Sequence, residues 1–342
     1  MDRRDVLRLG LGATALSFTG KLSGQILGHR ETKMYGWVPD IQGTRRFIRN
    51  HPRPYFVQNS EKSVKGSGKG RIVLLYKALE RALGGQIVPH YQELGDCVGQ
   101  ASGIGVDVLT AAQIYINGRA ERFKAKASTE SVYAGSRFEI GYKEHGIASI
   151  LRGDGSNVRW AVEFLQKYGV LLRGKYGEYD LSEYNPRLAK QWGRTGVPDE
   201  LEAQIKEHPV RTFALCQNYE DVRDAIANGY PVIVGSRVGF SSCFRHNVDG
   251  RDEMGFLVPC GDWSHAMCFI GVDDESGRPG CLCMNSHGDF VQGGTRHDQP
   301  VGSFWVDADV VTEMCSYEDA YAISNYIGYP AQPEFINYNL FS

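Results

Sequence analysis

The sequence lacks several features that would assign it to a specialised class of protein. No apolar run reaches the roughly 18 to 20 residues of a membrane-spanning helix, so we expect no integral membrane segment. Its 38 basic and 40 acidic residues give a formal net charge of -2, which provides no field for binding nucleic acid. Eight cysteines in 342 residues are too few for a disulfide scaffold. The 42% hydrophobic content instead predicts a globular chain with a sizeable core.

Motifs for phosphate and metal binding are also missing. The glycine-rich residues 60–71 lack the G-x-x-x-x-G-K-S/T spacing of a phosphate-binding loop, and we interpret them as a flexible linker. The cysteines and histidine between Cys260 and Cys283 lack the paired C-x-x-C spacing of zinc knuckles. Strand alternation also argues against a disulfide between Cys268 and Cys283. We therefore expect no metal and no organic cofactor.

The amino terminus resembles an export leader. Arg3 and Arg4 precede a short, weakly apolar run, as in twin-arginine leaders, so residues 1–28 predict a periplasmic or secreted protein. The alternative is an ordinary amphipathic helix on a cytoplasmic protein. We expect residues 29–90 to be an N-terminal extension, residues 91–330 to form the main domain, and residues 331–342 to be a C-terminal tail.

The remaining pattern changes from helical to strand-like along the chain. Helical spacing and glycine ends predict helices over residues 71–85, 97–116, 157–168 and 221–229. β-Branched segments between glycine-rich turns predict strands over residues 230–239, 265–275, 280–286 and 302–311. A mostly helical half before a mostly strand half predicts an α+β fold with two lobes.

One cysteine stands where a reactive thiol would be expected. In "QELGDCVGQASG", Cys97 begins a predicted helix, and the unpaired N–H groups of a helix start stabilise the thiolate, which is the reactive form. A nucleophile needs a base and the base an orienting group, and His265 and Asn285 lie at or near the ends of predicted strands. A lone cysteine is most often a small buried residue, so Cys97 alone would not indicate catalysis. Its combination with His265 and Asn285 favours the catalytic interpretation.

Three blocks then resemble a known family. "QELGDCVGQA", "SHAMCFIGVDD" and "MNSHGDFVQGG" are similar, in this order, to the cysteine, histidine and asparagine blocks of the papain-like cysteine peptidases. "GDGSNVRWAVEFLQKYGV", "NGYPVIVGSRVG" and "GSFWV" extend the resemblance to about residues 35–326. It implies a papain-like α+β fold with a helical lobe that carries the nucleophile and a β-rich, barrel-like lobe that carries the histidine and asparagine.

The resemblance also implies a role for each matching residue. Cys97 would be the nucleophile, His265 the base, and Asn285 the group that orients the imidazole. Gln92 would donate to the oxyanion beside the backbone N–H of Cys97. The implied activity is hydrolysis of a peptide or protein substrate through a thioester, without a cofactor.

Substrate contacts follow from the same blocks. Gly153 and Gly155 would offer their backbone to an extended peptide, although both could be simple turn glycines. Trp263, two residues before His265, is the third residue that we expect to contact the substrate.

Several residues depart from the family pattern. Asp96 places a negative charge beside the nucleophile, which opposes thiolate formation. Gln92 is five residues before Cys97 where six are usual, and His287 replaces the tryptophan that shields the asparagine–histidine bond. The long spacing between Cys97 and His265 places an insertion between residues 173 and 209. Two alternatives therefore stay open: a papain-fold binding or structural module with weak or no catalysis, and an acyl transferase with the same triad.

Overall fold

The structure is a computed structural model that describes residues 35–88, 91–116, 122–206, 210–240, 252–291, 293–294 and 296–332. The predicted leader, residues 1–28, and most of the predicted tail lie outside these ranges. The described residues belong to one compact unit. Among their helices, none combines the length and the apolar character needed to cross a membrane.

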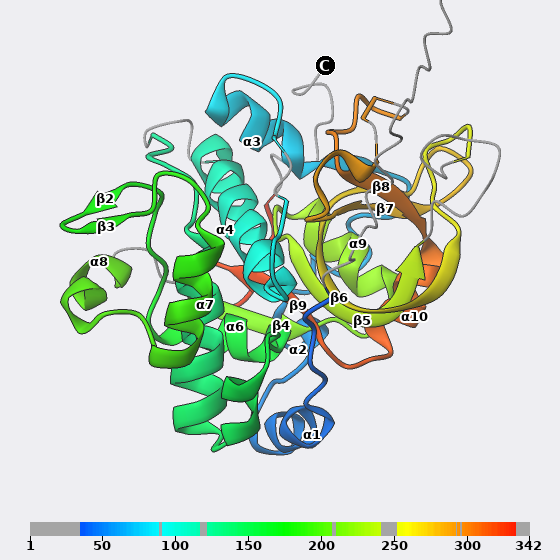
Figure 1. Ribbon diagram of the computed structural model, residues 1–342. Coiled ribbons are helices and arrows are strands. Elements are labelled where there is room, and N and C mark those ends of the chain that lie inside the picture. Colours follow the sequence, from blue (N-terminus) through cyan, green and yellow to red (C-terminus); the bar gives the residue numbers. More distant parts are fainter. Residues whose placement is uncertain are drawn as a thin grey trace, which may run out of the picture. The chain divides into compact units, whose positions relative to one another are not determined.

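A seven-stranded antiparallel sheet forms one side of the fold. Its strands follow the order β4-β9-β5-β6-β7-β8, and β1 pairs with the far end of β6. Figure 1 shows these strands curving strongly, with α9 lying against them. The strands are β1 (Ile72–Leu74), β4 (Thr212–Leu215), β5 (Val232–Phe240), β6 (Pro259–Asp273), β7 (Gly280–Met284), β8 (Ser303–Asp307) and β9 (Ala320–Ser324).

Helices form the other side, around the long helix α4 (Figure 1). The first three helices of the described chain, and α4, are α1 (Ile41–Asn50), α2 (Phe56–Asn59), α3 (Leu75–Leu83) and α4 (Cys97–Ile116). The middle of the chain holds α5 (Thr129–Ala134), the π-helix η1 (Gly135–Glu144), the 3-10 helix η2 (Ala148–Arg152) and α6 (Val158–Lys167). Three further helices lie between strands of the sheet in the sequence: α9 (Tyr219–Ala227), the 3-10 helix η4 (Gly288–Phe290) and α10 (Ala308–Cys315).

The predicted insertion, residues 173–209, contains a small hairpin and short helices. Its described elements are β2 (Lys175–Tyr176), β3 (Tyr179–Asp180), α7 (Pro186–Thr195), the 3-10 helix η3 (Asp199–Leu201) and α8 (Glu202–Ile205). The helix α7 packs on α5, so this segment belongs to the helical side of the fold.

Helix α4 joins the two sides because it is buried on nearly every face. It packs on β6 as well as on α3 and α5, and its side chains share one apolar core with the sheet. The glycines of α4 allow this close packing, since a Cβ at Gly99 would lie 2.8 Å from the Thr129 carbonyl oxygen. The α+β fold predicted from the sequence is thus confirmed, with Cys97 at the start of the central helix.

Three local predictions were wrong. Residues 71–85 are not one helix, because residues Ile72–Leu74 pair with β6 before α3 begins. Residues 302–311 are not one strand, because β8 ends at Asp307 and α10 follows. Residues 60–71 are not a free linker, because Gly66 and Gly68 donate backbone hydrogen bonds to Asp224.

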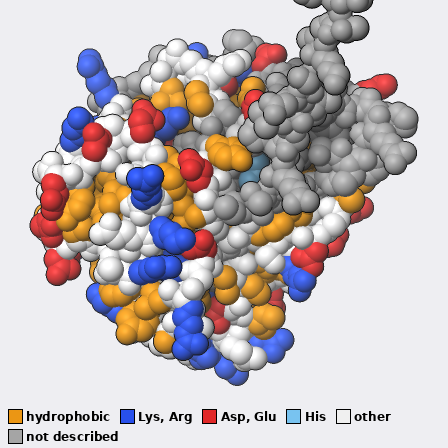
Figure 2. All heavy atoms as spheres, viewed as in Figure 1, with side chains coloured by type: hydrophobic (Ala, Val, Ile, Leu, Met, Phe, Trp, Pro, Cys, Tyr) orange, Lys and Arg blue, Asp and Glu red, His pale blue; other side chains and the backbone are white. Residues whose placement is uncertain are grey.

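The surface carries both signs of charge. Figure 2 shows basic and acidic side chains distributed over the visible face, with hydrophobic side chains between them. This distribution agrees with the near balance of 38 basic and 40 acidic residues in the sequence.

Candidate active site

Cys97 is the first residue of α4, and its side chain is completely buried. Backbone N–H groups of Ala266, Gly36 and Val98 surround the thiol and favour its anion. Burial, together with the neighbouring Asp96 carboxylate, outweighs these donors and raises the pKa of the Cys97 thiol to about 12. In this conformation the thiol is therefore protonated at neutral pH, even though a helix start favours the thiolate.

His265 and Asn285 lie on the sheet side and are hydrogen-bonded to each other. His265 Nε2 lies 2.8 Å from Asn285 Oδ1, and both residues are buried. The backbone N–H of Ser286 donates to the same Oδ1 at 2.7 Å, which identifies this atom as the oxygen of the amide. The Nε2 of His265 therefore carries the proton in this bond. Ala266, the next residue of β6, lies against the thiol, so the structure brings the histidine and the cysteine to the same place.

Gln92 is tied to the residue that follows Asn285. Its backbone N–H donates to the Ser286 carbonyl at 3.0 Å, and its side-chain Oε1 accepts from the Ser286 hydroxyl at 2.5 Å. Its Nε2 donates to the Leu94 carbonyl at 3.0 Å. The structure thus places Gln92 at the site, while its role as oxyanion donor stays a prediction.

Asp96, which directly precedes Cys97, is completely buried. Its Oδ2 accepts hydrogen bonds from Gln100 Nε2 and from the Tyr184 hydroxyl, each at 2.9 Å. Burial raises the pKa of this carboxyl to about 7, and nearby Glu130 adds to the shift. Asp96 is therefore partly protonated at neutral pH, and its negative charge is partly removed from the neighbourhood of the thiol.

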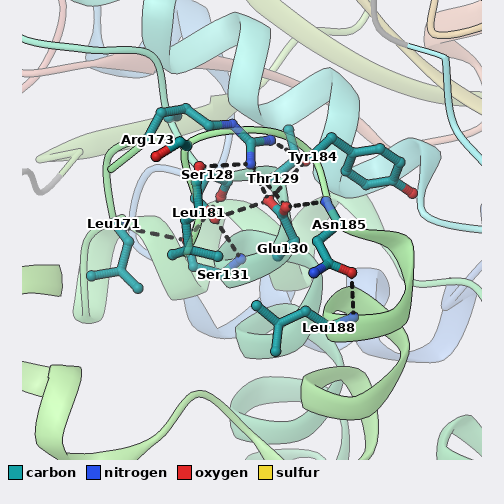
Figure 3. A network of polar contacts seen from close by, with 12 residues as sticks. Ser128, Thr129, Glu130, Ser131, Leu171, Arg173, Leu181, Tyr184, Asn185 and Leu188 are labelled. Atoms are coloured by element: carbon teal, nitrogen blue, oxygen red, sulfur yellow. Dashed lines mark hydrogen bonds and ion pairs between the residues drawn. The ribbon is translucent and has the colours of Figure 1, made fainter. Parts of the chain in front are cut away.

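Tyr184 reaches Asp96 because a second buried carboxylate fixes the chain beside it. Glu130 is fully buried and accepts from Arg173 at 2.7 and 2.8 Å, from the backbone N–H of Asn185 at 2.7 Å, and from the Ser128 hydroxyl at 3.0 Å. Figure 3 shows this Glu130 network with Tyr184 at its edge, directly before Asn185. The insertion is thus anchored to α5 beside Tyr184, the residue through which it contacts Asp96.

Aromatic rings cover the sheet side of the site. His287 stacks on His265 with ring centroids 4.6 Å apart and an angle of 24° between the planes. Trp263 meets both imidazoles edge-on, at 6.1 Å and 5.8 Å. Tyr35 lies 5.9 Å from Trp263 and 6.1 Å from His265. Trp263 therefore lies beside His265 and His287, but it is buried against other rings of the chain.

Residues 35–38, here called the cover segment, lie over the thiol. The N–H groups of Gly36 and Trp37 donate to the Ser264 carbonyl at 3.1 and 3.0 Å. On the helical side, Ser156 N–H donates to the Gly36 carbonyl, and Val38 N–H donates to the Ser156 carbonyl, both at 2.7 Å. Only glycine fits at position 36, since a Cβ would lie 2.0 Å from the Gly95 carbonyl oxygen. The cover segment thus forms a backbone ladder beside Cys97 and next to His265.

Of the two glycines predicted to bind substrate, Gly155 lies against this ladder, whereas a Cβ at Gly153 would meet no atom within 4 Å. Arg137, which is buried, donates to the carbonyls of Gly153 and Gly155, and Tyr133 accepts from the Gly155 N–H at 3.3 Å. A Cβ at Gly155 would lie 2.9 Å from the Gly36 carbonyl oxygen. Hydrogen bonds therefore hold this loop where an extended peptide was expected, and the chain's own cover segment lies beside it at Gly155.

A narrow cavity separates α4 from the sheet beside the triad. Its volume is about 20 Å³, which is about the space of a single water molecule. Its lining includes Gln100 and Ile104 of α4 and Ala266, Met284 and Asn285 of the sheet side. Among the described residues, no group of three or more His, Cys, Asp or Glu side chains is arranged to hold a metal ion.

Comparisons with known proteins identify the fold. No family model matches the chain, and no curated protein matches its sequence. The chain is similar to the solved structure of xylellain, a cysteine protease from Xylella fastidiosa, with a TM-score of 0.56 and 19% identity over 85% of this chain and 96% of that chain. It is also similar to procathepsin B S9 from Trypanosoma congolense, with a TM-score of 0.48 and 10% identity over 84% and 85% of the two chains. The likeness to xylellain shows that this chain has a papain-like fold.

Sequence reasoning missed the residues that reach the site from a distance. Gly36 and Ser156 form the ladder, and Tyr184 contacts Asp96 from a position 88 residues further along the chain. The pattern "YGWVPD" signals only that the segment is extended. Its partner could not be read from composition or spacing.

Proposed function

We propose that this chain is a cysteine-type peptidase that hydrolyses peptide bonds through Cys97, His265 and Asn285. The observation that carries the proposal is the 2.8 Å bond between His265 Nε2 and Asn285 Oδ1, beside a thiol that begins a helix. Because Asn285 engages Nε2, the proton of the thiol passes to Nδ1 of His265. The resulting thiolate and imidazolium form the nucleophile and the acid of the reaction.

The reaction then follows from these groups. The Cys97 sulfur forms a bond to the substrate's carbonyl carbon, and the carbonyl oxygen becomes an oxyanion that the Cys97 N–H and Gln92 stabilise. The imidazolium gives its proton to the leaving amine as the carbon–nitrogen bond breaks, which leaves a thioester. Water, deprotonated by His265, hydrolyses the thioester and restores the thiol. Loss of one oxyanion donor typically costs about 3 kcal/mol of transition-state stabilisation.

The cover segment sets a condition on this activity. A substrate reaches Cys97 only after the ladder between Gly36, Ser156 and Ser264 has opened, because the thiol has no exposed surface in the closed form. Opening also returns water to the thiol, which removes much of the burial that raises its pKa. The proposed enzyme is thus latent while the cover segment stays bound.

The same closed thiol favours a second candidate function. A papain-like fold whose nucleophile stays buried would act as a binding or structural module, with the cover segment as a permanent part of it. If this candidate is correct, the protein will not hydrolyse a substrate even after the ladder has been opened.

Replacement of the nucleophile tests the first proposal. We expect Cys97→Ala to abolish hydrolysis of a denatured protein substrate, whereas Cys268→Ala, at a buried thiol of β6, retains it. Hydrolysis that survives Cys97→Ala would disprove the assigned mechanism. Product analysis with an added primary amine separates hydrolysis from acyl transfer, because a transferase would form the substituted amide.

We also propose that the protein is exported. The support is Arg3 and Arg4 before a weakly apolar run, in a segment outside the described residues. Fractionation of cells that express the full chain tests this, with Arg3→Lys and Arg4→Lys together as the variant that should stay in the cytoplasm.

A further inference from the structure

His287 contacts both His265, the proposed base, and Asn285, which orients the ring of His265. Its ring stacks on His265 at 4.6 Å, and its Nδ1 lies 3.3 Å from Asn285 Nδ2. It follows β7 by three residues and is partly exposed. The papain-like pattern has a tryptophan at this position, which shields the same bond but does not titrate.

The hydrogen bonds around Asn285 determine which nitrogen of His287 is protonated. The Ser286 N–H and His265 Nε2 both point at Oδ1, so the amide presents its NH₂ group to His287. An NH₂ group donates, and His287 Nδ1 must therefore accept. Acceptance requires that Nδ1 carry no proton, which makes His287 a neutral imidazole in this arrangement.

We propose that His287 is a positioning residue that holds the Asn285 amide while neutral and, when protonated, disables the charged form of His265. Two imidazolium rings stacked at 4.6 Å repel each other, so a proton on one ring makes protonation of the other less favourable. While His287 is neutral, the face of its ring also lies over the His265 cation. Protonation of His287 Nδ1 turns this acceptor into a donor. The Asn285 NH₂ group then loses its hydrogen bond to His287.

Among the residues that the structure describes, few other titrating groups face His287. His265 faces His287 from β6, and Tyr35 faces it from the cover segment at 6.4 Å, with Trp263 as the uncharged neighbour at 5.8 Å. Tyr91 pairs with the backbone of His287. Asp289, two residues along the same segment, is exposed. The His265 and His287 rings therefore titrate as a coupled pair, and acid adds its second proton at the cost of the Asn285 contact.

The test follows the imidazole of His265 by NMR between about pH 4 and about pH 8, a range in which histidine normally titrates. The wild type should show two inflections at His265, one for each proton of the pair. His287→Trp and His287→Gln should each reduce these to a single step. His51→Gln, at the exposed carboxyl end of α1, is the control that should leave both steps in place.

The rate of Cys97 alkylation by iodoacetamide gives a second reading. In acid, His287→Trp should keep a faster rate than the wild type, by about tenfold for each pH unit by which the midpoint moves. A His265 signal that titrates in one step, with the same midpoint in the wild type and both variants, would overturn the inference. The part of this inference that concerns catalysis rests on the proposed peptidase function, but the NMR titration does not require hydrolysis. Coupled titration without hydrolysis would contradict the function alone.

Discussion

The two sides of the candidate site are held in different ways. On the sheet side, His265, Asn285 and His287 lie within 23 consecutive residues, and antiparallel pairing of β6 with β7 brings them together. On the helical side, the surroundings of Cys97 depend on Gly36 and on Tyr184, which come from distant parts of the chain. The pair of His265 and Asn285 is thus built by regular local pairing, whereas the surroundings of Cys97 are built by segments from distant parts of the chain.

The largest effect should come from breaking the anchor of the helical side. Glu130→Ala leaves Arg173 without its buried partner, and we expect a loss of about 3 to 5 kcal/mol in the free energy of unfolding. Urea denaturation measures this loss. Glu202→Ala, which removes an exposed ion pair with Lys206, should change nothing measurable. Equal stability of the two variants would mean that the Glu130 network does not anchor the insertion.

Opening the ladder should have the next largest effect. In Gly36→Ala, the new Cβ overlaps the Gly95 carbonyl, so the cover segment should leave the site. Overpacking of this kind shifts the closed–open equilibrium by roughly tenfold to hundredfold, and the rate of Cys97 alkylation should rise in proportion. Gly85→Ala is the matched control, because a Cβ there meets no atom within 4 Å. An unchanged alkylation rate in a folded Gly36→Ala protein would show that the ladder does not limit access.

Removing the charge beside the nucleophile should have a smaller effect. Asp96→Asn deletes a carboxylate that raises the pKa of Cys97, so that pKa should fall. A fall of one unit would make alkylation below the midpoint about tenfold faster. The pH dependence of iodoacetamide labelling measures the shift, with Asp309→Asn, at an exposed residue of α10, as the control. A pKa that rises or stays constant would contradict the proposed role of Asp96.

The smallest effect is a gradual dependence of stability on pH. Burial raises the pKa of Asp96 and Asp107 to about 7 and that of Asp319 to about 6, from the ordinary 3.8. As the pH rises, these carboxyls lose their protons in the unfolded chain before they do so in the folded protein. Deprotonation therefore favours the unfolded chain, and the free energy of unfolding should fall as the pH rises from about 4 to about 7. Hydrogen bonds to His297 and Arg296 lower the pKa of Asp273, which adds stability that is lost below about pH 4.

Urea midpoints across this pH range measure the slope. Asp107→Asn should make the slope shallower, because its Oδ1 can still accept from the Ala127 N–H without binding a proton. A wild-type protein whose stability rises steadily from about pH 4 to about pH 7 would contradict the raised values.

The sequence predicted well what depends on local pattern. The start of α4 at Cys97 and of α6 after Asn157 follows from helical spacing, and the core strands follow from β-branched runs. It failed where distant pairing overrides local preference. Residues Ile72–Leu74 resemble the first turn of a helix, yet they join the sheet because β6 offers them an open edge. The ladder of Gly36 and Ser156 was missed for the same reason, since neither residue carries a signal that names its partner.

The position of Gly36 over Cys97 also affects how readily the Cys97 thiol is oxidised. Oxidation of a cysteine to sulfenic acid requires a thiolate that peroxide can reach. Cys97 under Gly36 is neither ionised at neutral pH nor exposed. The covered protein should therefore survive storage and passage through oxidising surroundings with its thiol intact. Once the cover segment has left the site, the Cys97 thiol should become reactive towards substrate and, at the same time, susceptible to oxidation.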